Sequence, residues 1–309
     1  MLINDEKHYV TLNNYLRSRF NSKVFRISLN AGLSCPNRDK SPNNIGCLYC
    51  SSNLSGDFGG NKEDSFFEQF KSIKEIMEQK WHDGLYIAYL QAGSNTYADI
   101  NKLKGIYSEV IDLDEKIVIL SIATRPDCIN EEIISLLKEI QQKKEIWIEL
   151  GFQTMHDETK DKLNIGYHNT DFENAMELLN KNNIPTIVHV INGLPGETKE
   201  MMIDTIKYLN KFNISGIKIH MLHILKNTPL GTIYQNNPFK VLSKDEFIEI
   251  SVEQLRLLNP NIVIHRITGD PDKEDLIEPN WVLKKFVVLN DIDKLMRKEN
   301  YYQGDLWQK

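Results

Sequence analysis

An α/β fold is predicted, with a parallel sheet covered by helices in one barrel-like domain that has short extensions. Short apolar segments alternate with longer amphipathic segments along most of the chain, which is typical of repeated βα units. A chain of 309 residues is long for an ordinary domain but normal for a single α/β barrel. No linker or low-complexity segment divides the chain. We therefore expect one large core.

Six apolar segments are predicted to form the strands of this sheet. They are rich in Ile, Val and Leu, and in several of them polar and apolar residues alternate. The segments are 24–29, 85–91, 117–123, 146–151, 186–191 and 216–221. A last apolar run, 262–264, follows them near the C-terminus and places Ile264 and Arg266 on one face.

Amphipathic segments between the strands predict the helices. In the first, residues 5–20, the side chains of Tyr9, Leu12, Leu16 and Phe20 recur at helical spacing. The other predicted helices are 64–81, 98–113, 130–142, 157–163, 170–182, 199–212 and 243–258.

Three of the four cysteines follow the first strand. Cys35, Cys47 and Cys50 are separated by eleven and then two residues. The C-x-x-C turn of Cys47 and Cys50 suits two thiolates on one metal centre. Cys35 would return to them across a Pro-, Asn- and Gly-rich loop that no helix or strand is expected to span. Three thiolates without a fourth nearby predict a centre with one open coordination position.

Two other uses of these cysteines stay open at this point. Cys47 and Cys50 could form a thioredoxin-like redox pair, although Cys35 would then be unused and the βαβ context is missing. The loop could also hold structural zinc, although a fourth Cys or His at short spacing usually closes such sites. An iron–sulfur cluster agrees best with the spacing. Cys128 is distant in sequence and is expected to be a small buried residue.

Composition argues against a membrane protein and against a protein coated in positive charge. No apolar run approaches the roughly 18 residues that span a bilayer. Residues 1–6 lack the basic and apolar regions of a signal peptide. Few cysteines, clustered at metal-binding spacing, indicate the reducing cytoplasm. The formal net charge of −6 still allows a local basic surface for nucleic acid.

Polar or small residues gather where the predicted strands end. On the fourth strand Glu149, Gly151 and Gln153 share one face, and His189 is the polar member of its face on the fifth. Comparable positions near the other strands are held by Gln91, Gly93, Arg125, Gly193, Lys218 and Arg266. Barrel enzymes build their active sites at the C-terminal ends of the strands, so these residues are candidate site residues. A satisfied buried hydrogen-bond network is the alternative.

Several motifs resemble the radical S-adenosylmethionine (SAM) superfamily, in its elongator-catalytic-subunit-like class. The segments similar to that class are Thr124–Cys128, Glu149–Thr154 and His189–Gly196. The chain looks most like the bacterial YhcC/YtqA-type family. That similarity is carried by Cys35–Asp39, Gln91–Tyr97, His265–Thr268, Pro279–Trp281 and Gln303–Gly304.

The resemblance implies a partial (βα)6 TIM-type barrel over residues 23–235. Residues 1–22 would be an N-terminal helical extension and residues 236–309 a C-terminal extension packed on the barrel. It implies a 4Fe–4S cluster held by Cys35, Cys47 and Cys50, with SAM at the open iron. Reduction would cleave SAM to a 5′-deoxyadenosyl radical that abstracts a substrate hydrogen.

The resemblance also implies roles for the residues at the strand ends. SAM would be bound near Gln91, Gly93, Gln153, His189 and Gly193. The remaining cavity would be lined by Arg125, Lys218 and Arg266 as substrate or carboxylate clamps. The chain departs from the family pattern at Ile165, where relatives often carry Arg, and at Ala123, where elongator proteins carry Glu. Arg125 or Lys162 would then have to hold the SAM carboxylate.

The implied activity is tRNA modification, at the C5 side chain of a wobble uridine, with an electron donor such as flavodoxin or ferredoxin. Two basic sets could contact phosphates, or be ordinary solvated surface: Arg17, Arg19, Lys23, Arg26, Arg38 and Lys40, and then Lys284, Lys285, Arg297 and Lys298. A radical SAM enzyme acting on a small molecule or peptide is one alternative. A non-catalytic protein that binds zinc or an iron–sulfur cluster is the other.

Overall fold

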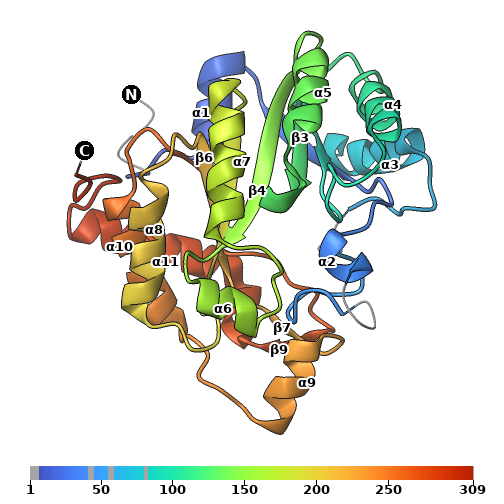
Figure 1. The fold of residues 1–309 in the computed structure, drawn as a ribbon. Coiled ribbons are helices and arrows are strands. Elements are labelled where there is room, and N and C mark those ends of the chain that lie inside the picture. The colour runs from blue at the N-terminus through green and yellow to red at the C-terminus, as the bar shows by residue number, and fades with distance from the viewer. Residues whose placement is uncertain (1–6, 41–44, 55–58, 80–82, 309) are drawn as a thin grey trace.

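The computed structural model describes residues 7–40, 45–54, 59–79 and 83–308. Its centre is a curled sheet of seven parallel strands (Figure 1). In sheet order they are β1 (Val24–Leu29), β2 (Leu85–Leu90), β3 (Ile117–Thr124), β4 (Glu145–Gln153), β5 (Thr186–Asn192), β6 (Gly216–Met221) and β8 (Val263–Ile267). The six predicted strands and the partial barrel are confirmed. The apolar run at 262–264 adds the seventh strand, which pairs with β6.

Helices cover the sheet and frame its C-terminal end. They are α1 (Leu12–Phe20), α2 (Pro36–Asp39), α3 (Phe66–Glu78), α4 (Ile100–Ile111), α5 (Glu131–Gln141), α6 (Asp157–Lys162), α7 (Asn169–Lys181), α8 (Lys199–Leu209), α9 (Pro229–Asn236), α10 (Lys244–Leu257) and α11 (Lys285–Lys298). Short 3₁₀ turns occupy Pro126–Cys128 and Asn280–Lys284, and β7 (Ile224–Leu225) pairs antiparallel with β9 (Leu276–Glu278). Capping boxes at Ser65 and Ser243 fix the starts of α3 and α10.

The first helix is shorter than its apolar spacing predicts. Residues 5 and 6 lie outside the described residues, and α1 begins only at Leu12, with the Thr11 hydroxyl accepting from the Asn14 amide. Thr11 also forms a parallel bridge with Ile264, and the Ile264 amide donates to the Val10 carbonyl. Residues 7–11 are therefore not helical, and Val10 and Thr11 run along the edge of β8.

The cysteine loop contains one turn of helix that its composition did not predict. α2 starts directly after Cys35, with Pro36 at its first position, where the missing amide hydrogen and fixed φ of proline are favourable. The turn ends at Asp39 and therefore does not span the loop from Cys35 to Cys47. The turn places Asn37 and Arg38 close to the two later cysteines.

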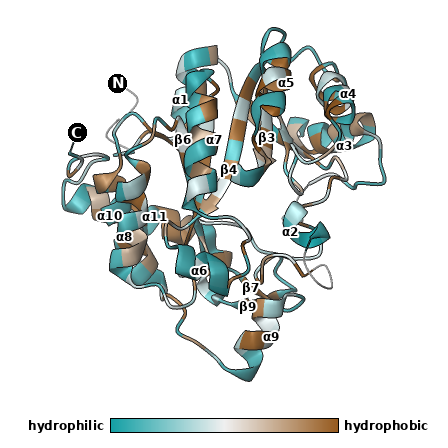
Figure 2. Cartoon of the chain, viewed as in Figure 1, coloured by the Kyte–Doolittle hydropathy of each residue, from teal (hydrophilic) through white to brown (hydrophobic). Residues whose placement is uncertain are grey.

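Apolar residues fill the outside of the sheet and one end of its inside. Ile148, Leu150 and Phe152 on the outer face of β4 are fully buried in the main core. Inside, Leu16 of α1 packs with Ile87, Ile119, Trp147 and Ile187. Figure 2 shows hydrophobic and hydrophilic residues alternating along β4, whereas α6 is hydrophilic. The N-terminal end of the half-barrel is thus closed by an apolar floor, and polar residues lie above it.

Candidate active site

The three cysteines lie where β1 leaves the sheet. Cys35 is the residue before α2, and Cys47 and Cys50 are joined in a tight turn by a 3.0 Å hydrogen bond from the Cys50 amide to the Cys47 carbonyl. None of the three cysteines is in a disulfide bond, and all three are partly exposed. Arg38 donates to the carbonyls of Cys50 and Ser52, at 3.4 and 3.0 Å, and so ties α2 to the C-x-x-C turn.

Two of the sulfur atoms face nitrogen donors. Asn37 Nδ2 lies 3.3 Å from Cys47 Sγ and 2.6 Å from the Asn164 carbonyl, and Arg125 Nη1 lies 3.8 Å from Cys35 Sγ. Burial raises the pKa of the Cys47 thiol, and the Arg125 charge and the Asn37 hydrogen bond oppose that shift. N–H donors aimed at sulfur stabilise thiolates and the negative charge of an iron–sulfur cluster. This donor set fits a cluster with three protein ligands.

Cys128 does not belong to this set. It is buried in the 3₁₀ turn after β3, and burial raises its pKa to about 12, which keeps it a thiol. It lines a separate hollow of about 370 Å³ with Pro36 and Tyr97. Within the described ranges, no three His, Cys, Asp or Glu side chains are grouped closely enough to hold one metal ion. A cluster differs from such a site because each thiolate binds its own iron.

Arg125 is bound to protein through every donor that it has. Nε and Nη2 reach the two Asp127 carboxylate oxygens at 2.9 Å, and Nη1 and Nη2 reach the carbonyls of Ile165 and Gly166 at 2.9 and 3.2 Å. With the contact to Cys35, these match the five N–H groups of a guanidinium. In this arrangement Arg125 ties Cys35 to the 165–166 loop and directs no remaining N–H at a substrate.

The Ile165 side chain, at the position where relatives often carry Arg, is fully buried. It packs with Leu163, Tyr167 and Leu194 in a small apolar cluster beside Cys47. Its carbonyl oxygen, in contrast, lies 3.9 Å from Cys47 Sγ. The loop therefore contributes backbone carbonyls and not a cationic side chain. Lys162 is exposed at the end of α6.

The backbone conformation supports two of the predicted SAM-site residues, Gly93 and Gln153. A Cβ atom at Gly93 would lie 2.4 Å from the Leu33 carbonyl oxygen, and φ there is +74°. Gln153 also has a positive φ, +68°, next to an irregularity in the pairing of β4 with β5. Its Nε2 would lie 2.7 Å from a Cβ at Gly151. Strained backbone at a non-glycine residue is a feature of ligand sites, so Gln153 keeps its candidacy.

The other two glycine and glutamine candidates, Gln91 and Gly193, follow different strands, β2 and β5. Gln91 follows β2, where its amide donates to the Leu29 carbonyl at 3.1 Å, directly before the loop that meets the cysteine segment. Gly193 follows β5 with φ +85°, and a Cβ there would meet Met221 and Leu242. Gly93 thus contacts the cysteine segment, whereas Gly193 packs toward β6 and the C-terminal part of the chain.

A carboxylate buried inside the half-barrel organises the charged candidates. Glu149 accepts from Ser121 Oγ at 2.7 Å and from His189 Nε2 at 2.8 Å, and it pairs with Lys218 and, at 3.1 Å, with Arg26. Burial alone would raise its pKa, but Arg26 and Lys218 hold the pKa of Glu149 well below its usual range. Glu149 is therefore ionised within a buried network of ion pairs and hydrogen bonds.

Burial in the same network lowers the pKa values of Lys218 and His189. Burial and the nearby Arg26 lower the pKa of Lys218 to about 7, although Glu149 opposes that shift. Burial and Lys218 lower the pKa of His189 to about 4. Lys218 Nζ also lies 3.4 Å from the Tyr89 hydroxyl. Arg26 points inward to Glu149, so the expectation that it contacts phosphates at the surface is wrong.

Three further histidines line the interior beside β6 and β8. His220 and His223 each have a buried Nε2 with no hydrogen-bond partner among the described residues, as does Nδ1 of His265. Burial lowers the pKa of all three, so the rings are neutral. None of these three histidines was among the predicted site residues. His265 lies beside Gly216 on β6. The polar residues within the apolar segment of β8 were the sequence feature that could have marked His265 as a site residue.

Arg266 reaches the interior from an irregular strand. The pairing of β6 with β8 shifts between Ile217 and Lys218, so Ile264 packs in the outer core while Arg266 lies close enough to Lys218 and His220 to lower their pKa values. The expectation that Ile264 and Arg266 share a face is therefore wrong. Arg266 is paired with Asp270.

Comparisons with known proteins identify the family. A model of the Radical SAM superfamily matches residues 43–209, and one of the Radical_SAM C-terminal domain matches residues 214–298. The chain belongs to the Radical SAM superfamily. YtqA of Bacillus subtilis (strain 168) is 40% identical over 306 residues, which are 99% of this chain and 95% of YtqA. The resemblance to the YhcC/YtqA-type family is confirmed.

Two other similarities point to elongator-type proteins. A tRNA uridine(34) acetyltransferase of Methanocaldococcus jannaschii is 27% identical over 140 residues, 44% of this chain and 25% of that protein. The solved structure of archaeal Methanocaldococcus infernus Elp3 matches with a TM-score of 0.69 at 18% identity, over 91% of this chain and 64% of that one. At that identity the likeness shows the fold alone.

Membership of the superfamily fixes the class of chemistry. Radical SAM enzymes use a 4Fe–4S cluster and SAM, so the chain is an enzyme with these cofactors, and the non-catalytic reading is set aside. Across the part of the chain that the structure describes, no helix is long and apolar enough to cross a membrane.

Proposed function

We propose that Cys35, Cys47 and Cys50 hold the 4Fe–4S cluster of this radical SAM enzyme. The observation that carries the proposal is the pair of N–H donors at the sulfurs, Asn37 at Cys47 and Arg125 at Cys35. When bound, the reduced cluster and SAM supply a 5′-deoxyadenosyl radical that abstracts a hydrogen atom from the substrate. The protein's part is to orient both cofactors and to exclude water.

The residues around the cysteines divide this task. Asn37 and Arg125 hold the cysteine segment against the 164–166 loop, so Arg125 is a positioning residue in place of the clamp that its position suggested. Gln91, Gly93 and Gln153 lie at the ends of β2 and β4 and would bind SAM, with His189 presenting a neutral ring held by Glu149. Gly193 is the least supported of the predicted SAM contacts, because it packs against Met221 and Leu242.

The substrate is proposed to be tRNA, modified at the C5 side chain of a wobble uridine. The support is the similarity of 140 residues of the chain to a tRNA uridine(34) acetyltransferase. The unpartnered nitrogens of His220 and His223, with Arg266 beside them, are the polar groups available to such a base inside the half-barrel. The enzyme would act in the cytoplasm and take electrons from a flavodoxin or ferredoxin.

Nucleoside mass spectrometry of tRNA from a deletion strain tests the substrate. We expect one wobble-uridine derivative to disappear and its precursor to accumulate, with both restored by the wild-type gene but not by a Cys47→Ala gene. An unchanged nucleoside profile would overturn the tRNA assignment. Salt-insensitive SAM cleavage stimulated by a small molecule or peptide would then support the alternative substrate class.

A further inference from the structure

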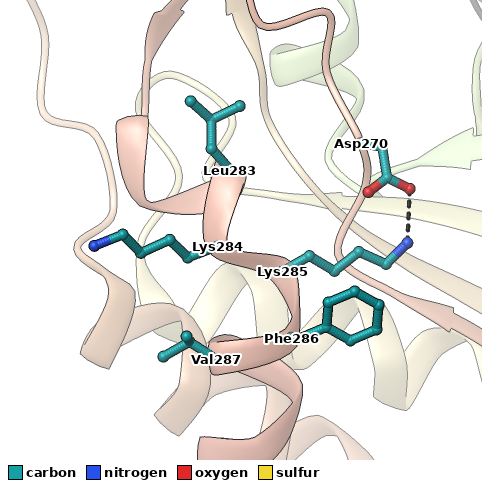
Figure 3. Close-up of a pocket in the computed structure, with 6 residues that line it drawn as sticks. All are labelled: Asp270, Leu283, Lys284, Lys285, Phe286 and Val287. Atoms are coloured by element: carbon teal, nitrogen blue, oxygen red, sulfur yellow. Dashed lines mark hydrogen bonds and ion pairs between the residues drawn. The ribbon is translucent and has the colours of Figure 1, made fainter.

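A solvent-exposed aromatic ring stands beside the C-terminal mouth of the half-barrel. Phe286 at the start of α11 is 77% exposed, the largest value among the large hydrophobic residues that the structure describes. Leu283 and Val287 are 42% and 44% exposed. Together with Lys284, Lys285 and Asp270 these residues line a hollow of about 420 Å³ (Figure 3), which we call the Phe286 patch.

The patch is basic although the chain is acidic overall. Lys285 Nζ lies 2.6 Å from Asp270 Oδ2, and the same carboxylate pairs with Arg266. In Figure 3 the Phe286 ring lies alongside the Lys285 side chain on the side of Asp270, while Lys284 and Val287 point the other way. Two cations, Lys285 and Arg266, thus pair with one carboxylate, and Lys284 adds a third positive charge on the other side of the helix, in a chain whose formal net charge is −6. That local excess favours a polyanionic partner.

One short loop connects the patch to the interior. Gly269 touches two of the interior histidines: a Cβ there would lie 2.8 Å from His223 Cε1 and 3.5 Å from His220 Nδ1. The next residue, Asp270, belongs to the patch. A ligand bound in the patch at Asp270 would therefore lie one residue away from Gly269, which contacts the polar lining of the half-barrel. β8, which precedes this loop, is the last strand of the seven-stranded sheet.

We propose that the Phe286 patch binds a single-stranded segment of the RNA substrate, with a base stacked on Phe286 and phosphates near Lys284 and Lys285. Single-stranded nucleic acid is bound by aromatic platforms flanked by cations, because every base has a stacking face and every linkage a charge. This inference rests on the proposed tRNA substrate and adds the surface that would hold a base next to the active site.

Fluorescence anisotropy with a labelled oligouridine of about ten nucleotides tests the patch. We expect Phe286→Ala and Phe286→Leu to weaken binding about tenfold, because Leu is apolar but offers no ring, and Phe286→Trp to retain it. Phe67→Ala is the matched control, since Phe67 is 60% exposed on α3. Lys284→Ala should reduce the salt slope by about 0.7, whereas Lys298→Ala, at the other end of α11, should not.

Three outcomes would overturn the inference. They are equal loss of binding in the Phe286→Ala and Phe67→Ala proteins, no binding by the wild-type protein, and a dimer that Phe286→Ala splits into monomers without any change in RNA binding. The last would make the patch a contact between two copies. Complementation of the deletion strain separates the two claims: if Phe286→Ala restores the tRNA profile fully, the patch fails while the tRNA substrate stands.

Discussion

Arg125 shows how a residue can be found by sequence and its role still depend on the fold. Its position after β3 marked it as a site residue, but only the structure places the Ile165 and Gly166 carbonyls and Asp127 around it. Asp127 is a local partner, but the two carbonyls lie 40 and 41 residues away in sequence, so no local pattern predicts them. A guanidinium whose donors are all used holds neighbouring groups in place.

We expect Arg125→Lys to weaken cluster binding by about 10- to 100-fold, because a lysine cannot keep Asp127, the two carbonyls and Cys35 together. The cluster that does form should have a more negative reduction potential, since a hydrogen bond to sulfur is lost. Iron content after reconstitution and a spectroelectrochemical titration measure the two effects. Arg17→Lys on the exposed side of α1 is the control. Unchanged iron content and potential would refute the positioning role.

Glu149 is expected to support the folded state more than any surface carboxylate does. Glu149→Gln would leave Arg26 and Lys218 buried around a neutral group and should cost about 3–5 kcal/mol of unfolding free energy. The exposed pair of Glu253 with Lys199 provides the control, because Glu253→Gln should cost less than about 1 kcal/mol. Urea denaturation measures both. Equal losses in the two proteins would contradict the buried network.

At the scale of elements, the alternating pattern predicted the six strands almost to the residue. It could not predict what depends on distant pairing: the extended backbone before α1 follows from the bridge of Thr11 to Ile264, and the inward turn of Arg266 follows from the irregular pairing of β8. α9, α11 and the β7–β9 pair were missed; α9 and the two strands are short, whereas α11, with 14 residues, is not. The division of the chain after residues 22 and 235 stays a prediction.

The contact between the β2 loop and the cysteine segment should depend on Gly93. Gly93→Ala would place a methyl group 2.4 Å from the Leu33 carbonyl and strain a positive φ, so we expect lower iron incorporation and a less stable protein. Gly105→Ala in α4 is the control, because a Cβ there meets nothing within 4 Å and should stabilise the helix by about 0.5–1 kcal/mol. Normal iron incorporation in Gly93→Ala would show that the segment tolerates the shift.

The neutral histidines of β5 and the loop after β6 should make stability depend on pH. The pKa values of His189 and His223 fall from 6.5 to about 4 on folding, so between those values the unfolded chain binds protons that the folded chain does not. The unfolding free energy should therefore rise from about pH 4 to 6.5, by about 1.4 kcal/mol per pH unit for each histidine. Denaturation at several pH values checks this. His223→Asn should reduce the slope and the exposed His168→Asn should not; an equal slope in both would contradict the buried neutral ring.

At the scale of the whole molecule, the half-barrel separates two environments. α1 and the apolar residues around Leu16 close its N-terminal end, while the cysteine segment, the Arg125 loop and the histidines surround its C-terminal end. Family membership gives the chemistry at that end, and the fold gives the residues that are close enough to take part. In the proposed function the substrate would bind at the mouth and on the Phe286 patch, which sequence reasoning marked only by Lys284 and Lys285.

Anaerobic reconstitution with iron and sulfide, followed by SAM and dithionite, tests the central claim most directly. The wild-type protein should release 5′-deoxyadenosine, and Cys35→Ala, Cys47→Ala and Cys50→Ala should each lose both the cluster absorbance and this product. Cys128→Ala should retain both, because Cys128 is a buried thiol outside the set. Release of 5′-deoxyadenosine by Cys47→Ala, or its loss in Cys128→Ala at normal folded yield, would contradict the assignment of the three ligands.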